Sequence, residues 1–237
     1  MRRVVFKFRF LSLVVFAMLA GVWPMAAQAA TAPNLGSAAN FAVLAGTAVT
    51  CTHSTVTGDV GVYPGTAVTR TGCHIAGSIH AGDAVAQAAS ADFLIAYAAI
   101  AKLACDFPPL TTLNQTLSSP GVYCFDAAAT STGGTLTLNG PADGIWIFKV
   151  GTGGTGALTG TNFSVVMAGS GQPCNVDWWV AQAATMTDSN FVGTILAGAA
   201  ITITRGTFTG NALATAEVTM TDTALVGCKA TGGGKGK

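Results

Sequence analysis

The six cysteines are the residues of this chain best suited to covalent chemistry. They are Cys51, Cys73, Cys105, Cys124, Cys174 and Cys228. No two of them form a Cys-x-x-Cys pair, so their spacing does not favour a zinc site. An even number of cysteines in an exported chain predicts three disulfides instead. Pairing in sequence order gives Cys51–Cys73, Cys105–Cys124 and Cys174–Cys228, although six cysteines allow fifteen pairings.

The other side chains that commonly bind metals or catalyse reactions show no catalytic pattern. His53, His74 and His80 lack a His-Glu-x-x-His motif and a cysteine partner, and the acidic residues are scattered. Residues 151–156 fit the Gly-x-Gly-x-x-Gly pattern, but a strand pattern follows them where a dinucleotide site needs a helix. We therefore expect no catalytic residue, no metal and no cofactor.

Sugar chemistry is also disfavoured. Trp178 and Trp179 could stack on a sugar ring, but neighbouring residues on a strand face opposite sides, so we expect one of them in the core. A polysaccharide lyase built on a β-helix is one hypothesis for the function, and two non-catalytic hypotheses are set out below. The lyase is the weakest of the three hypotheses, because no cluster of Asp, Lys and Arg recurs at a fixed spacing in the sequence.

Threonine is the residue whose frequency most needs an explanation. The chain has 32 threonines, and only 9% of its residues are charged, against about a quarter in ordinary proteins. A threonine hydroxyl can order a water molecule, and β-branching restricts χ1, so a row of threonines on a strand is rigid before it binds anything. The simpler explanation is that threonine favours strands.

Two internal repeats place the threonines at fixed spacing. In the C-terminal part the step is 17 residues, because Thr185-Met186-Thr187 recurs at 202–204 and at 219–221. In the N-terminal part the step is 19 residues, because Thr47-Ala48-Val49-Thr50 recurs at 66–69. Three consecutive Thr-x-Thr triplets with almost no Lys or Glu among them favour a surface role over strand propensity alone.

A repeat of this length has room for three short strands and three turns, which make one coil of a β-solenoid. Met186, Ile203 and Met220 would point inward, and the threonines on either side would point outward. Coils stack about 4.8 Å apart through backbone hydrogen bonds, so equivalent residues form ladders. The sequence therefore predicts a mainly β fold, a right-handed triangular β-solenoid (β-helix) with flat threonine walls.

One segment departs from the strand pattern. Residues 82–104 are rich in alanine, contain no proline and carry apolar residues near helical spacing, while Asp83 suits an N-cap. We expect one long helix over about 83–104, mostly buried along one solenoid face because it carries so little charge. Strands are expected to resume at 121–125, 135–138 and 145–150.

Both ends of the chain are expected to lie outside the solenoid domain, which we place at 30–230. Residues 1–29 have the basic start, the apolar run and the small residues before a cut that mark a secretory signal, with an uncleaved membrane anchor as the alternative. Residues 231–237 are expected to form a flexible tail.

The charge that remains after cleavage excludes several partners. Removal of the signal leaves seven basic and ten acidic residues, a net charge near −3, and no basic face for nucleic acid or anionic lipid. No segment after the signal is expected to be long and apolar enough to cross a bilayer.

Several motifs occur together in an order typical of one known family. They are NLGSAANFAVLAG, TGDVGVYPGTAVT, GSIHAGDAVAQAASADF, PGVYCF, GIWIFKVG, CNVDWWV and GNALATAEVTM, all between residues 34 and 228. In these motifs the chain resembles the microbial ice-binding proteins. The resemblance implies a discontinuous β-solenoid flanked by one long helix, with one flat face of short outward side chains that adsorbs to ice.

The resemblance also implies a turn of the form Thr-Gly/Ala-x-Thr/Asn in the binding face. Residues 159–162 match it fully, 187–190 and 204–207 match at their ends, and 221–224 keep only the first threonine. In three of these turns charged residues replace Gly or Ala: Asp188, Arg205 and Asp222.

Two walls are candidates for the binding face. The expected face comprises residues of these turns and of the neighbouring strands: Thr55, Thr57, Thr159, Asn162, Ser164, Thr187, Asn190, Thr204, Thr207, Thr209, Thr221 and Ala224. The second candidate is the ladder of Thr185, Thr202 and Thr219, which could instead contact the helix.

The sequence and the resemblance together predict a secreted, monomeric, non-catalytic protein. Its expected partner is the surface of an ice crystal, and it is expected to inhibit ice growth and recrystallisation. The alternative is a cell-surface adhesion or extracellular-matrix module that uses the same flat face against polysaccharide or another solenoid.

Overall fold

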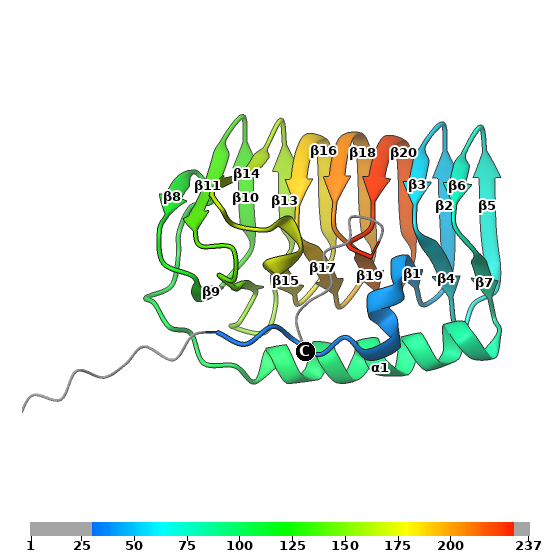
Figure 1. Cartoon of the computed structure of the whole chain (residues 1–237), viewed down its shortest axis with the longest axis horizontal. Coiled ribbons are helices and arrows are strands. Elements are labelled where there is room, and N and C mark those ends of the chain that lie inside the picture. The colour runs from blue at the N-terminus through cyan, green and yellow to red at the C-terminus, as the bar shows by residue number, and fades with distance from the viewer. Residues whose placement is uncertain (1–29, 230–237) are drawn as a thin grey trace, which may run out of the picture.

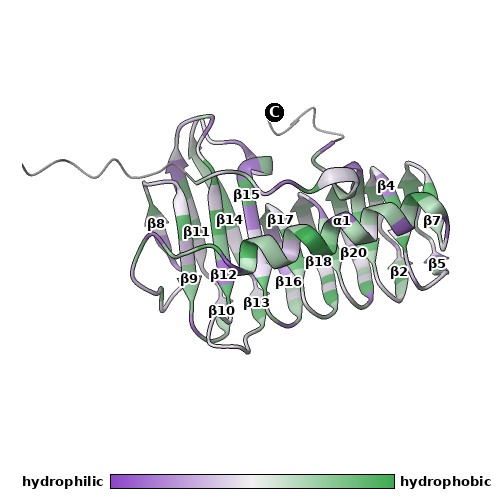
Figure 2. Ribbon diagram, turned by 90° about the horizontal axis from the view of Figure 1, so that it is seen from below, coloured by the Kyte–Doolittle hydropathy of each residue, from purple (hydrophilic) through white to green (hydrophobic). Residues whose placement is uncertain are grey.

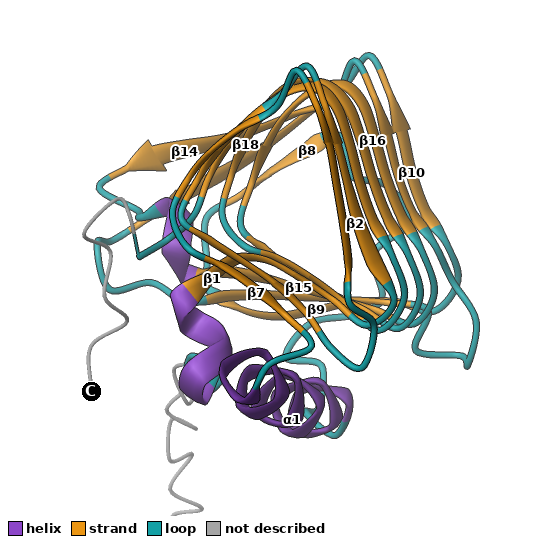
Figure 3. Cartoon of the chain, turned by 90° about the vertical axis from the view of Figure 1, so that its right-hand side faces the viewer, coloured by secondary structure: helices purple, strands orange, loops and turns teal. Residues whose placement is uncertain are grey.

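The computed structural model of the chain describes residues 30–229, so the predicted signal (1–29) and tail (231–237) lie outside the described residues. Within the described part, short parallel strands wind into a solenoid with a triangular cross-section (Figure 3). A long helix, α1, lies against one of the three sides (Figures 1 and 3). This architecture confirms the predicted mainly β solenoid with one flanking helix.

The side that α1 covers is an eight-stranded parallel sheet, called here the helix side. From one end of the solenoid to the other its strands are β7 (Ile79–Ala81), β4 (Asp59–Val62), β1 (Phe41–Ala45), β19 (Ala212–Ala214), β17 (Thr194–Ala197), β15 (Val176–Val180), β12 (Trp146–Val150) and β9 (Gly121–Phe125).

The other two sides are formed by a second sheet that bends around a corner. Three of its strands are nine residues long and run across both sides: β16 (Ala184–Val192), β18 (Ile201–Thr209) and β20 (Val218–Val226). In the other coils the corner separates shorter strands. On the side that precedes the corner they are β5 (Ala67–Thr71), β2 (Ala48–Thr52), β13 (Leu158–Thr161) and β10 (Ala129–Thr132). On the side that follows it they are β6 (His74–Ala76), β3 (Thr55–Thr57), β14 (Ser164–Gly169), β11 (Thr135–Gly140) and β8 (Gln115–Leu117).

The order of the coils in space differs from their order in the sequence. The first strands of the chain pair with the last ones, β1 with β19 and β2 with β20. Residues 41–81 therefore stack beyond the C-terminal coil, and α1 then runs along the solenoid to the opposite end, where β8 and β9 begin the return (Figures 1 and 2). The 17-residue and 19-residue repeats thus belong to one stack, in which Thr50 lies beside Thr219.

Helix α1 (Ala84–Ala101) begins where the sequence predicts and ends at Ala101 rather than near residue 104. The Asp83 carboxylate accepts a hydrogen bond from the backbone N–H of Ala86 at 2.8 Å. The expectation that the helix is mostly buried is wrong, because one stripe faces the solenoid while the opposite stripe, with Leu94 and Ile95, is exposed. The buried residues are Ala86, Ala89, Phe93, Ala96 and Ile100.

The expectation that no segment after the signal could cross a bilayer also needs correction. By length and composition α1 is apolar enough to do so. In the structure its buried stripe belongs to a protein core, where Phe93 and Ile100 share one cluster with Leu44, Trp179 and Leu196 of the helix side.

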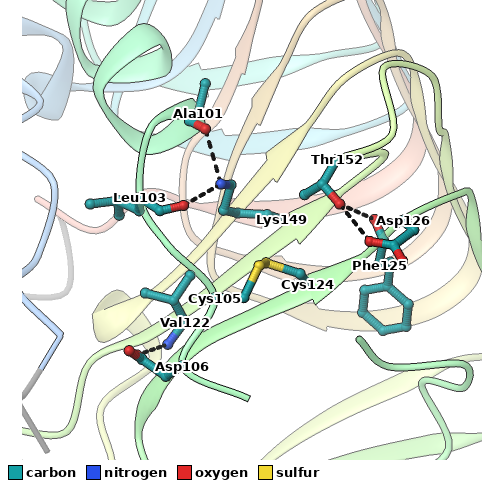
Figure 4. The surroundings of a disulfide bond; sticks show 10 residues. All are labelled: Ala101, Leu103, Cys105, Asp106, Val122, Cys124, Phe125, Asp126, Lys149 and Thr152. Atoms are coloured by element: carbon teal, nitrogen blue, oxygen red, sulfur yellow. Dashed lines mark hydrogen bonds between the residues drawn. A yellow bond between two sulfur atoms is a disulfide. The ribbon is translucent and has the colours of Figure 1, made fainter. Parts of the chain in front are cut away.

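A buried lysine holds the C-terminal end of α1 (Figure 4). The Lys149 ammonium donates hydrogen bonds to the carbonyl oxygens of Ala101 at 3.0 Å and of Leu103 at 2.6 Å. These groups lie where a helix runs out of internal donors, and a cation is favoured there by the helix dipole. Burial lowers the pKa of Lys149. The Cys105–Cys124 disulfide joins the segment after α1 to β9 beside this lysine, because Cys124 pairs with Lys149 across the two strands.

The three disulfides expected from sequence order are all confirmed. They are Cys51–Cys73, Cys105–Cys124 and Cys174–Cys228. A disulfide stabilises a fold mainly by restricting the unfolded chain.

The two tryptophans of β15 face opposite sides, as the strand pattern predicts. Trp178 points into the solenoid, where its ring stacks on Phe148 with centroids 4.2 Å apart. Trp179 points outward beneath α1, where its ring lies 5.2 Å from that of Tyr97. Both indoles are buried, so neither forms an exposed platform for a sugar.

Acidification should weaken the attachment of α1 to the rest of the fold. Asp92 on α1 accepts hydrogen bonds from the hydroxyl and the backbone N–H of Ser37 at 2.6 and 2.7 Å, and these lower its pKa. The hydrogen bonds from Ala86 and His80 lower the pKa of Asp83 in the same way. Both carboxyls have folded pKa values below the ordinary 3.8, so the unfolded chain takes up protons first as the pH falls.

The contribution of these two carboxyls to the free energy of unfolding should therefore be constant well above 3.8, decline as the pH falls through that value, and level off below the folded pKa values. Urea unfolding at a series of pH values measures this slope. Asp92→Asn should flatten it, whereas Asp143→Asn in the exposed turn before β12 is the matched control and should not. An Asp92→Asn slope identical to that of the unmodified chain would contradict the assignment.

Candidate functional site

Fourteen threonines form two unbroken columns on one side of the solenoid, which we call the Thr face. Each coil contributes one Thr-x-Thr triplet, and parallel pairing places each triplet in register with the next. The first column is Thr69, Thr50, Thr219, Thr202, Thr185, Thr159 and Thr130. The second column is Thr71, Thr52, Thr221, Thr204, Thr187, Thr161 and Thr132. All fourteen side chains are half-buried or exposed.

The residue between the two threonines of each inner triplet points into the core. In three consecutive coils it is Met186, Ile203 or Met220, and each is 2% exposed or less. The predicted inward ladder is therefore confirmed. Because the core fixes every second residue, the outward threonines cannot shift along the strand without unpacking the interior.

The Thr face lies away from the helix. Figure 3 shows the Thr face as the side formed by β2, β16 and β10, while α1 runs beneath the side formed by β1, β7, β15 and β9. The expectation that the ladder of Thr185, Thr202 and Thr219 could contact the helix is thus wrong. Among the described residues, α1 packs on the helix side, and the Thr face is open to solvent.

The corner at the end of the Thr face is made by a third column, one residue per coil in the left-handed backbone region. These residues are His53, Asn162, Asp188, Arg205 and Asp222, with φ between 46° and 56°. In the coils at the two ends, glycines take the same place, Gly72 and Gly133, with φ of 61° and 64°. The turn directs the chain onto the next side, so these side chains edge the Thr face and do not interrupt it.

Charges alternate along this corner. The Arg205 guanidinium donates to the Asp188 carboxylate, with Nη2 2.8 Å from Oδ2, and this hydrogen bond lowers the pKa of Asp188. On the other side, Asp222 lies 3.8 Å from the His53 ring nitrogen. The three charged residues that replace Gly or Ala in the expected turns are therefore paired with their neighbours along the corner.

The side beyond the corner is less regular, and we call it the mixed face. Its first outward column is Thr135, Ser164, Asn190, Thr207, Ala224, Thr55 and His74. Its second is interrupted, because β14 pairs with β16 only at Ser164 and Asn190: Thr137 and Val166 form one part, and Val192, Thr209, Val226, Thr57 and Ala76 form the other. Both columns thus mix side chains of different shape and polarity.

The twelve residues expected from the sequence do not form one plane. Four lie on the Thr face: Thr159, Thr187, Thr204 and Thr221. Asn162 lies at the corner. Seven lie on the mixed face: Thr55, Thr57, Ser164, Asn190, Thr207, Thr209 and Ala224.

The register explains this division. Thr159 pairs with Thr185, the first threonine of its triplet, so residues 159–162 run along the Thr face and end at the corner. Thr187 is the second threonine of that triplet, so residues 187–190 begin beside the corner and pass onto the mixed face. The four turns grouped by their residue types are therefore not equivalent in space. Seven further threonines of the Thr face belong to neither of the two walls expected from the sequence, although Thr-x-Thr triplets mark all of them: Thr50, Thr52, Thr69, Thr71, Thr130, Thr132 and Thr161.

The sequence of residues 43–226 matches the family described as Ice-binding-like. The chain belongs to this family. Among curated proteins, the chain is 37% identical over 182 residues to an ice-binding protein of Nostoc sp. (strain HG1) and 32% identical over 187 residues to one of Flavobacterium frigoris (strain PS1). These matches cover 74% and 71% of this chain, and the chain spans 65% and 66% of the two relatives.

Solved structures of ice-binding proteins share the fold. One from an Antarctic biological consortium matches with a TM-score of 0.77 and 31% identity, over 87% of this chain and 96% of that chain. One from the Antarctic ascomycete Antarctomyces psychrotrophicus matches with a TM-score of 0.75 and 30% identity, over 83% of this chain and 98% of that chain. The solenoid of this ice-binding-like chain, with its flanking helix, is thus the fold of the family. Within residues 30–229, no group of three His, Cys, Asp or Glu side chains is placed to hold a metal ion.

Proposed function

We propose that this protein adsorbs to ice through the Thr face and thereby inhibits ice growth and recrystallisation, without catalysing a reaction. The observation that carries this proposal is the pair of threonine columns, seven residues each and without a substitution, on an open side of the solenoid. The names of the relatives, all of which are ice-binding proteins, support the same function.

The geometry of the Thr face suits a crystalline partner. Neighbouring coils lie about 4.8 Å apart and the two columns about 6.8 Å apart, so the hydroxyls form a two-dimensional grid. Such a grid can hold water molecules in a regular array, which a curved loop surface cannot do. Each contact is weak, and ordering a free side chain costs about 0.5–1.5 kcal/mol. Threonines with restricted χ1 in a parallel sheet are already ordered, so most of this cost is avoided.

The mixed face is the second candidate, and three features disfavour it. Its outward columns contain aliphatic, amide and imidazole side chains beside threonine. The hydroxyl of Thr207 donates to the side-chain oxygen of Asn190 at 2.8 Å, so its proton is not available to a water on that side. Val166 is 44% exposed and offers a water molecule no polar atom.

The purified chain should show both thermal hysteresis and inhibition of ice recrystallisation. The two measurements should give activity that rises with protein concentration and disappears after the protein is reduced and unfolded. Bovine albumin at the same mass concentration is a suitable inert control. Zero activity in both assays with folded protein would refute the proposed function.

Export and a monomeric state complete the proposal. Three disulfides are consistent with an oxidising compartment outside the cytoplasm. A single Thr face per chain suffices for adsorption, so no second subunit is needed. Adhesion to a polysaccharide or to another solenoid, the alternative derived from the sequence, finds no support among the relatives.

A further inference from the structure

The two ends of the solenoid are built differently. At the end formed by β8 and β9, the segment between α1 and β9 packs over the core, with Leu113 buried and Phe107 stacked on Tyr123 at 4.3 Å. At the other end, β5, β6 and β7 are the last strands of the three sides, and each pairs with a neighbour on one edge only. This end, at the right in Figure 1, is called here the open end.

Apolar side chains that would be core in an inner coil are uncovered at the open end. Val68 and Ile75 are half-buried, whereas Val49 and Val56, their partners in the next coil, are fully buried. Ile79 is 38% exposed. A further coil stacked on this end would bury these side chains and pair three rows of backbone groups at once.

Arg70 breaks the apolar pattern at the centre of β5. It pairs with Cys51, and the same inward column continues through Met220, Ile203 and Met186. Arg70 therefore occupies an inward-facing position, yet its side chain is exposed because no coil lies beyond it. A charge pointing inward at a sheet edge is one of the means by which β proteins prevent edge-to-edge pairing.

We propose that the open end has the shape and the free strand edges to pair with the open end of a second copy of this chain. In the unmodified chain the charge of Arg70 prevents this pairing. Only another solenoid end presents strand edges on three sides with the same spacing, while a single extended strand could satisfy one side alone. In a two-fold end-to-end pair, each Arg70 would be enclosed between the uncovered apolar side chains of the two ends. Burying an unpaired charge is costly enough to prevent such association. This inference does not depend on ice adsorption.

The test is to replace Arg70 with valine and measure the molar mass by size-exclusion chromatography with light scattering. Arg70→Val should raise the mass from one chain to two as the concentration is raised, whereas the unmodified chain should remain at one. Thr69→Val changes the outward neighbour on the same strand and is the matched control, which should also remain at one. A dimeric unmodified chain, or a monomeric Arg70→Val variant at every concentration, would overturn the proposal.

A second substitution locates the contact. Ile79→Glu added to Arg70→Val should return the mass to one chain, because it places a new charge on the open end. Dimers that persist in this double variant would lie elsewhere on the molecule and would refute the assignment. If Arg70→Val does not fold, as judged by circular dichroism, Arg70→Gln removes the charge and keeps most of the bulk. That variant should dimerise at the highest concentrations, and its remaining monomeric there would refute the proposal.

Discussion

Thr202→Tyr should remove most of the thermal hysteresis while leaving the protein folded. Thr202 lies in the middle of the first threonine column, between Thr185 and Thr219. A tyrosine ring there would hold the surrounding grid away from the ice, so several neighbouring contacts are lost together with the one substituted. The loss of about 1.4 kcal/mol of adsorption free energy already corresponds to a factor of ten in an equilibrium constant. We therefore expect a reduction of about tenfold or more.

The matched control lies on the same strand. Thr207→Tyr introduces the same ring five residues further along β18, beyond the corner and on the mixed face. It should retain the activity of the unmodified chain. Melting temperatures of the two variants should be similar, because both side chains point away from the core. The reverse result, in which Thr207→Tyr is inactive and Thr202→Tyr is active, would move the binding surface to the mixed face.

Trp178→Ala should cost about 3–5 kcal/mol of the free energy of unfolding, the usual range for removing a buried large aromatic side chain. The indole is fully buried, stacks on Phe148 at 4.2 Å and lies 5.2 Å from the ring of Phe191. Its Nε1–H donates to the Val192 carbonyl oxygen at 3.0 Å. Because folded proteins are stable by only about 5–15 kcal/mol, this one change removes a large share of the total.

Urea unfolding followed by circular dichroism measures this loss. Trp178→Phe keeps an aromatic ring in the stack and loses the hydrogen bond, so it should cost clearly less than Trp178→Ala. A cost below about 1 kcal/mol for the alanine variant would show that the stack contributes little, since typical surface changes stay within about 0.5 kcal/mol.

The repeats explain why the solenoid itself could be predicted from the sequence. A step of 17 residues aligns Met186 with Ile203 and Met220, and the pairing of β16, β18 and β20 follows that alignment residue by residue. The disulfides could be predicted because each cysteine pairs with its neighbour in the sequence.

The division between the faces could not be predicted, and the corner residues show why. Glycine is the usual sign of a left-handed turn, but Asp188, Arg205 and Asp222 adopt that conformation in three consecutive coils. In the sequence, the residues on both sides of the corner therefore resemble one continuous strand, and the pattern predicts one face where the structure has two. The sequence also does not show which residues of α1 are buried, because alanine occupies both its buried positions, such as Ala89, and its exposed ones, such as Ala91.

The pairing of the first strands with the last ones constrains how the chain can acquire its structure. Strands β1 and β2 reach their inner neighbours, β19 and β20, only after some 170 further residues have been made. Contacts so distant in sequence make folding slow, because the chain must lose the entropy of closing a long loop before the stabilising contacts form. Until residue 226 is available, β2 and β18 each have an edge without its final partner. In this topology the last strand to be synthesised, β20, does not lie at an end of the stack but between β2, from the start of the chain, and β18.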